Sequence, residues 1–78
     1  MTHKQIRYSI HAAKRLKERH ITRGDVRWLI ANGLREPADT RGGETRWQVS
    51  AKIGKRNLYV IFIEGAAEVE VVTVAEKS

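Results

Sequence analysis

The spacing of hydrophobic residues predicts a helical first half and a strand-rich second half. Residues 9–20 contain good helix formers without glycine or proline, and the Ser9 hydroxyl is expected to cap this helix. A second helix is predicted over 24–32, where Thr22 and Asp25 have the spacing of a capping box. Gly33 is expected to end it as a left-handed C-cap.

After residue 44 the pattern becomes the alternation of a strand with one apolar face. Apolar Trp47, Val49, Ala51 and Ile53 alternate with polar Arg46, Gln48, Ser50 and Lys52. Residues 54–57 have the length of a hairpin turn. Residues 58–63 are apolar at both parities, which predicts a central strand that is buried on both faces. A last β-branched strand is predicted over 69–74, and residues 5–8 favour a short first strand.

These elements predict an α+β fold in the order β-α-α-β-β-β. The sheet is expected to be an antiparallel meander, with both helices packed on one of its faces. Residues 35–44, with glycines at 42 and 43, are predicted to form a polar connection. The 78 residues are expected to form one domain, 1–78.

The charge balance favours a polyanionic partner. Fifteen Lys and Arg against nine Asp and Glu give a net charge of +6, which points to nucleic acid ahead of a membrane or an acidic protein. A basic surface with no partner is the alternative. The absence of cysteine excludes disulfides and thiolate zinc sites. Without a long apolar run or a visible secretory signal, we expect a cytoplasmic protein that does not enter membranes.

The first predicted helix concentrates the candidate chemistry. At 100° per residue, one face opposite the core carries four polar side chains, with Arg19 at its margin. These four are His11, Lys14, Arg15 and Glu18. The face is either an active surface or a solvated one, and His11 adds little to a merely solvated face. His20 falls on the apolar stripe and is expected to be a boundary histidine at the end of the helix. No metal-ligand spacing is present, so we expect neither a metal nor another cofactor.

The predicted strands offer a second basic set. Arg46 and Lys52 lie on the polar side of one strand, while Lys55 and Arg56 are expected in the turn that follows. Such a surface could bind RNA, with aromatic side chains available for base stacking. The aromatic candidates are Tyr8, Trp28, Trp47 and Tyr59. Core packing is expected for Trp47 and exposure for Trp28.

The stretch YSIHAAKRLKERHITRGDV, together with GKRNLYVIFIEG and VEVVTV, resembles the bacterial family known as domain of unknown function 4258. The pattern H-A-x-x-R-x-x-x-R-x-I begins at His11 and covers Arg15, Arg19 and Ile21. That family is similar to the RelE and BrnT toxins, which are metal-independent ribonucleases of toxin–antitoxin systems. The resemblance implies a ribonuclease that uses His11, Arg15 and Arg19, with Glu18 adjacent. The end of the chain departs from many such toxins because it lacks a basic or aromatic cluster.

Three functions remain open at this point. The first is an endoribonuclease that cuts single-stranded RNA, with His11 or Glu18 as general base and Arg15 and Arg19 stabilising the developing charge. The second is a non-catalytic nucleic-acid-binding module. The third is a basic interaction domain for an acidic protein, such as an antitoxin. The sequence does not determine the oligomeric state.

Overall fold

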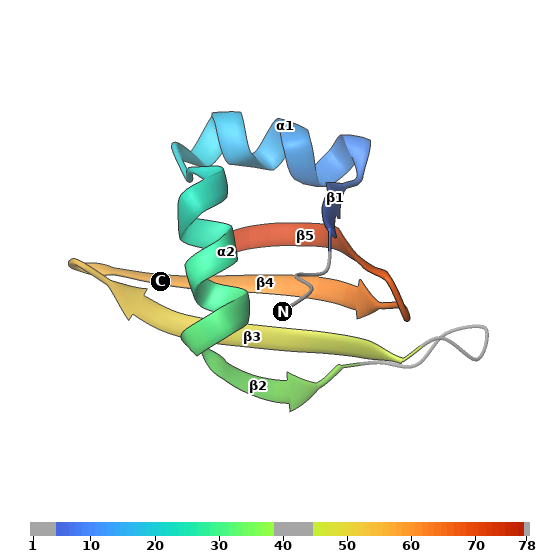
Figure 1. Cartoon of the computed structure of the whole chain (residues 1–78). Helices are drawn as coiled ribbons and strands as arrows, with labels where there is room; N and C mark the ends of the chain where they lie inside the picture. Colours follow the sequence, from blue (N-terminus) through green and yellow to red (C-terminus); the bar gives the residue numbers. More distant parts are fainter. Residues whose placement is uncertain (1–4, 39–44, 78) are drawn as a thin grey trace.

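Two helices cover one face of a five-stranded sheet (Figure 1). The computed structural model describes residues 5–38 and 45–77. The elements are β1 (Gln5–Tyr8), α1 (Ile10–Arg19), α2 (Arg23–Asn32), β2 (Leu34–Pro37), β3 (Arg46–Ile53), β4 (Arg56–Glu64) and β5 (Glu68–Lys77). The α+β class and the helix layer on one face agree with the sequence prediction.

The sheet is mixed rather than antiparallel throughout. Its strands lie in the order β1-β5-β4-β3-β2. β1 pairs in parallel with β5, whereas every other neighbouring pair is antiparallel. The prediction of a purely antiparallel sheet was therefore wrong at one edge. The crossover from β1 to β5 runs through all the other elements, so no local pattern reveals it.

The central strand is confirmed, but its predicted burial on both faces is wrong. β4 lies between β5 and β3, and Leu58, Val60 and Phe62 are buried against the helices. The alternate residues, Tyr59, Ile61 and Ile63, are only partly buried. The reason is that both helices pack on the same face: α1 on β5, and α2 on β3 and β4.

A strand that the sequence did not predict forms the second edge of the sheet. All four residues of β2 are exposed, and they pair with Trp47–Ser50 of β3. Arg35 lies with its guanidinium carbon 5.1 Å from the centre of the Phe62 ring and donates a hydrogen bond of 3.0 Å to Glu64. The first part of the predicted connection over 35–44 is thus an edge strand, while its glycines at 42 and 43 lie outside the described residues.

The starts of both helices follow the sequence prediction. The Ser9 hydroxyl accepts a hydrogen bond of 3.0 Å from the backbone N–H of Ala12. Thr22 and Asp25 form a complete capping box: the Thr22 hydroxyl accepts from the Asp25 N–H, and the Asp25 carboxylate accepts from the Thr22 N–H. Each bond satisfies a backbone N–H that has no partner within the helix.

α2 ends at Asn32 as predicted, but the end of α1 and the conformation of Gly33 differ from the prediction. α1 ends at Arg19, and His20 adopts the left-handed conformation with φ of 54°. Because the chain leaves the helical track there, His20 is exposed rather than part of the apolar stripe. Gly33, expected to be left-handed, has φ of −72° and is extended. It leads directly into β2, and a Cβ atom at this position would lie 2.6 Å from Cγ2 of Val49. Gly33 therefore permits close packing rather than an unusual backbone angle.

The hairpin between β3 and β4 is tighter than expected. The strands pair up to Ile53 and Arg56, which leaves only Gly54 and Lys55 as the turn. Gly54 has φ of 63°, the left-handed conformation that favours glycine. Arg56 consequently belongs to β4 and not to the turn, which directs its side chain toward the helix layer.

Candidate nucleic-acid interface

Four of the predicted site residues lie on the solvent-facing side of α1, opposite the sheet. His11, Lys14 and Glu18 are exposed, and Arg15 is partly buried. Within the described chain none of these four side chains forms a hydrogen bond or an ion pair. At 1.5 Å per residue, Arg15 lies about 6 Å along the helix axis from His11, and Glu18 about 10 Å. The face is thus accessible to a ligand, but no second group holds the imidazole in place.

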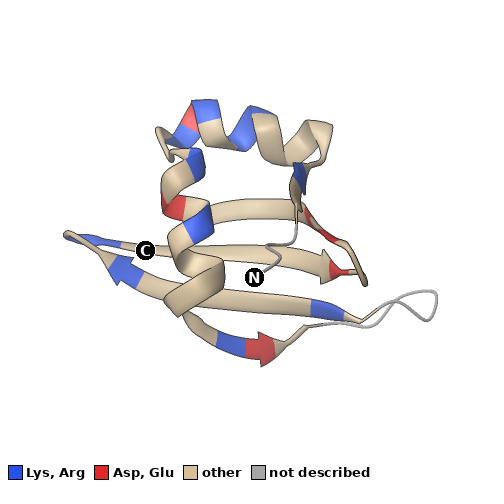
Figure 2. Cartoon of the chain, viewed as in Figure 1, with Lys and Arg blue, Asp and Glu red and all other residues tan. Residues whose placement is uncertain are grey.

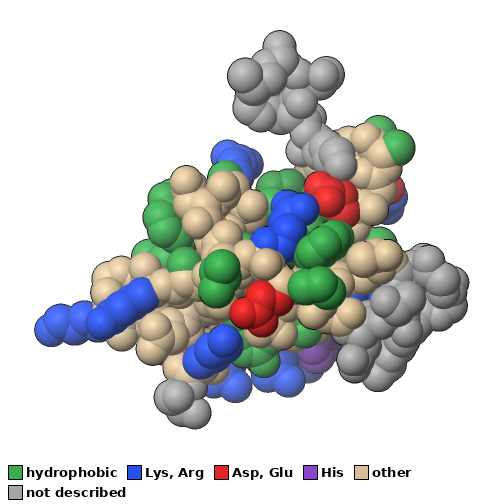
Figure 3. Space-filling model, turned by 90° about the horizontal axis from the view of Figure 1, so that it is seen from below, with side chains coloured by type: hydrophobic (Ala, Val, Ile, Leu, Met, Phe, Trp, Pro, Cys, Tyr) green, Lys and Arg blue, Asp and Glu red, His purple; other side chains and the backbone are tan. Residues whose placement is uncertain are grey.

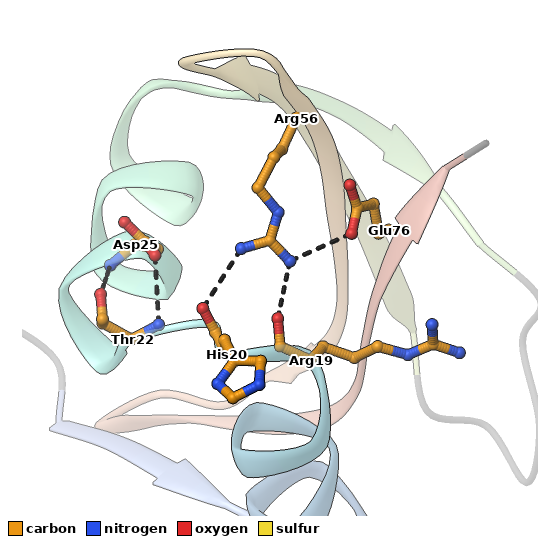
Figure 4. Close-up of polar contacts among 6 residues, drawn as sticks. All are labelled: Arg19, His20, Thr22, Asp25, Arg56 and Glu76. Carbon is orange, nitrogen blue, oxygen red and sulfur yellow. Dashed lines mark hydrogen bonds and ion pairs between the residues drawn. The ribbon is translucent and has the colours of Figure 1, made fainter.

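Arg19 is the predicted catalytic residue that the structure separates from His11. It lies at the other end of α1, roughly 12 Å along the axis. Its backbone carbonyl accepts a hydrogen bond of 2.7 Å from Nη2 of Arg56. Figure 4 shows the Arg19 side chain extending to the right, away from the imidazole of His20.

Arg56, predicted to bind nucleic acid, fastens the end of α1 to the sheet (Figure 4). Its guanidinium donates to the carbonyl oxygens of His20 at 3.2 Å and Arg19 at 2.7 Å, and to Oε1 of Glu76 at 3.0 Å. A cation is favourable there because carbonyl groups accumulate negative charge at a helix C-terminus. The hydrogen bond between the Arg56 and Glu76 side chains raises the pKa of Arg56 and lowers the pKa of Glu76. Sequence reasoning missed this contact because the partners of Arg56 lie on two elements distant in sequence, the end of α1 and β5.

The remaining predicted binding residues do not join the helix set. Arg46 and Lys52 lie at the two ends of β3, on the face that points away from the helices, roughly 20 Å apart at the rise of a strand. Lys55 lies in the hairpin turn. Figure 3 looks at the molecule from below and shows basic side chains dispersed among hydrophobic and acidic ones. The cations of the sheet are therefore scattered and do not form a second continuous basic surface.

The helix layer carries most of the net charge. α1 and α2 contain six cationic side chains: Lys14, Arg15, Lys17, Arg19, Arg23 and Arg27. Glu18 and Asp25 are the only acidic residues of the two helices, and Asp25 is engaged in the capping box. Figure 2 shows the predominance of basic residues on both helices. None of the six cations forms an ion pair within residues 5–38 and 45–77.

Three of the four strand arginines behave differently, the exception being Arg46. Arg7 pairs with Glu68, Arg35 with Glu64, and Arg56 with Glu76, at N–O distances of 3.0–3.3 Å. Most acidic residues of the described strands lie in the second half of the chain, where these arginines meet them. Positive charge on the strands is therefore partly neutralised inside the molecule, whereas that on the helices is open to a partner.

An open groove lies between β1 and α2, and sequence reasoning did not find it. It has a volume of about 740 Å³ and is lined by Ile6, Tyr8, Arg23, Arg27, Ile30 and Val69, among others. The guanidinium carbon of Arg23 lies 5.2 Å from the centre of the Tyr8 ring. Burial raises the pKa of the Tyr8 phenol, while the charges of Arg23 and Arg27 act in the opposite direction. The helical spacing of Arg23, Arg27 and Ile30 was visible, but the position of β1 beside them was not.

The described residues contain neither a cluster of metal ligands nor a membrane-spanning helix. Over 5–38 and 45–77, no three His, Asp or Glu side chains gather as metal ligands would. Neither helix in this part of the chain has the length and apolar character needed to cross a bilayer.

Fold and surface together define a small two-layer α+β protein with a basic helix layer. The family described as "Domain of unknown function (DUF4258)" matches residues 8–76, nearly the whole chain. The chain therefore belongs to this family. Comparison with the curated proteins and with the solved structures finds no match.

Proposed function

We propose that this protein binds single-stranded RNA across the outward surface of its two helices. The observation that carries the proposal is that the six cations of α1 and α2 lack ion pairs in the described chain, while Arg7, Arg35 and Arg56 each have a carboxylate partner. A nucleic acid carries cations condensed around its phosphates, and unpaired Lys and Arg side chains displace these cations when they bind. Their release into solution supplies most of the sequence-independent affinity for nucleic acid.

Two aromatic side chains favour a single strand over a duplex. Trp28 is 47% exposed on α2 and follows Arg27 in the sequence. Tyr8 lies under the guanidinium of Arg23. Unpaired bases can stack on such rings, whereas the bases of a duplex already stack on each other. The similarity to RelE and BrnT toxins implied by the sequence favours RNA over DNA.

Fluorescence anisotropy with a labelled single-stranded RNA tests binding. Lys14→Ala combined with Lys17→Ala removes two exposed helix cations, and Lys52→Ala combined with Lys77→Ala is the control of equal charge on the sheet. The helix double variant should bind more weakly and with less salt dependence, while the sheet double variant should stay close to the parent. Equal losses in both variants would show that only total charge matters, and the proposed surface would then be wrong.

A metal-independent endoribonuclease is the second candidate. Its support is that His11 and Arg15 lie one turn apart on the proposed RNA surface and that neither side chain bonds to the rest of the described fold. In this reaction His11 takes the proton of a 2′-hydroxyl, whose oxygen attacks the adjacent phosphorus while Arg15 stabilises the developing charge. The bond to the 5′-oxygen breaks, which leaves a 2′,3′-cyclic phosphate and a 5′-hydroxyl protonated from solvent. An acidic antitoxin would be the natural partner of such an enzyme.

Cleavage of RNA in the presence of EDTA, with a 2′-deoxy strand as the inert control, tests this candidate. His11→Ala should abolish most cleavage. His20→Asn is the matched control because asparagine tolerates the left-handed conformation of that position. If the parent binds RNA but cleaves none of several sequences, the protein is a binding module and the catalytic proposal is refuted.

A further inference from the structure

The groove between β1 and α2 arises because the helix layer leaves one end of the sheet uncovered. α1 packs on β5, and α2 packs on β3 and β4. Ile6 of β1 and Val69 of β5, together with Ile30 of α2, provide an apolar floor. The opening of about 740 Å³ lies within the roughly 300–1,000 Å³ that ligand sites usually occupy.

Two guanidinium groups border this floor. Arg23 and Arg27 lie one helical turn apart on α2, are exposed, and form no ion pair within the described residues. Contact with the Tyr8 ring orients the Arg23 guanidinium. The groove also contains the carboxylate of Glu64, but Glu64 accepts a hydrogen bond from Arg35, which offsets its charge.

We infer that this groove binds one nucleotide of the RNA strand, with the base against Ile6, Ile30 and Val69 and its phosphate on Arg23 and Arg27. This inference rests on the proposed RNA binding and extends it to a defined site. The charge pattern supports it because a nucleotide places a planar ring, whose faces can pack on apolar side chains, next to an anion, and the groove places an apolar floor next to two cations. Arg23 and Arg27 also belong to the basic helix layer, so a strand bound there can continue into the groove.

Titration of the ¹⁵N-labelled protein with uridine or adenosine monophosphate, followed by NMR, tests the site. The mononucleotide should shift the amide signals of Ile6, Tyr8, Ile30 and Val69. Inorganic phosphate alone should shift only signals close to Arg23 and Arg27. A short peptide with adjacent tryptophan and glutamate residues is a further probe. If this peptide shifts the floor signals and the mononucleotides do not, the groove is a protein-docking site and our inference is wrong.

Substitutions in α2 distinguish binding in the groove from binding elsewhere on the helix surface. Arg27→Ala should weaken mononucleotide binding about fivefold, as for loss of one exposed charge contact. Ala31→Leu should block the groove, because Ala31 lines it and is exposed, so the fold should be retained. The matched control is Asn32→Leu, which adds a similar side chain at the next, exposed position of α2.

The outcomes also distinguish this inference from the proposed function. If RNA binding depends on the helix cations but mononucleotides leave the groove signals unmoved, only the groove inference fails. If mononucleotides bind in the groove but the RNA strand does not bind, the groove is a nucleotide site, whereas the proposed function and the continuation of a strand into the groove both fail. Loss of mononucleotide binding in Asn32→Leu to the same extent as in Ala31→Leu would also overturn the groove assignment.

Discussion

Replacing Gly33 with alanine is expected to destabilise the protein strongly although its backbone angles suit any residue. With φ of −72°, alanine meets no conformational penalty. The added Cβ, however, would lie 2.6 Å from Cγ2 of Val49, 2.7 Å from the carbonyl oxygen of Leu29 and 3.0 Å from that of Ser50. Carbon atoms in contact normally stay about 3.5–4.0 Å apart, so β3 must move away from Gly33 by roughly 1 Å, and the backbone at the end of α2 must also shift to relieve the contact with Leu29.

Overpacking of this kind costs about 1–3 kcal/mol, and we expect the upper part of that range because two of the three contacts are with backbone atoms. A domain of this size has a total stability of roughly 4–12 kcal/mol. A loss of about 2–3 kcal/mol should therefore lower Tm by about 10–20 °C, since 1 kcal/mol corresponds to about 4–8 °C here. Urea unfolding followed by circular dichroism gives the free energy of unfolding directly.

Two further variants make the explanation refutable. Gly24→Ala adds a Cβ in α2 whose nearest neighbour, Oγ1 of Thr22, lies 3.6 Å away. It should stabilise the helix by up to about 1 kcal/mol. Gly33→Asn should be at least as destabilising as Gly33→Ala, because asparagine is larger. If Gly33→Asn were instead the better tolerated of the two, Gly33 would be a left-handed C-cap and the packing explanation would be wrong.

The other predictions concern the RNA surface and the clamp at the end of α1. With about five phosphate contacts, log K should fall with log salt at a slope of roughly −3.5, and the helix double variant should reduce this slope by about 1.4; a slope near zero would contradict phosphate binding. His11→Ala and Arg15→Ala should each leave the free energy of unfolding within about 0.5 kcal/mol of the parent. Removal of the general base in His11→Ala should slow cleavage by about 10²–10⁴-fold. Large losses of stability in these variants would instead show that the two residues are structural. Because Arg56 lowers the pKa of Glu76 in the folded state, the stabilisation is present above the ordinary carboxyl pKa and lost as pH falls through the lowered value. The Tm difference between the parent and Glu76→Gln should thus be constant near neutral pH and shrink below about pH 4; a difference that persists in strong acid would refute the ionic contribution.

Features encoded within short stretches of sequence were predictable. The capping box at Thr22, the cap at Ser9 and the central position of residues 58–63 each follow from neighbouring residues, and the structure confirms them. The exposure of His11 was likewise predicted from helical spacing. β2 was missed because an exposed edge strand of four residues needs no hydrophobic alternation: its backbone pairing with β3 determines its structure.

Features that join distant residues were not predictable. Arg56 contacts α1 and Glu76 only because β4, β5 and the end of α1 meet at one corner. The groove needs Tyr8 beside Arg23, which follows from the parallel pairing of β1 with β5. Arg56 was also predicted in the turn rather than in β4, and the sequence contains no signal for the spatial relation between these elements.

The insertion of β5 between β1 and β4 has a consequence for biosynthesis. β1 and α1 are made first, but β1 has its only described strand partner in β5, and α1 packs mainly on the same strand. Contacts with such long sequence separation form late, because the intervening chain must be present before they can close. While residues 68–77 are still in the ribosomal tunnel, α1 therefore lacks the surface on which it packs. α1, which carries four of the six helix cations, consequently acquires its final position only after this last strand has emerged, whereas α2 packs on the earlier strands β3 and β4.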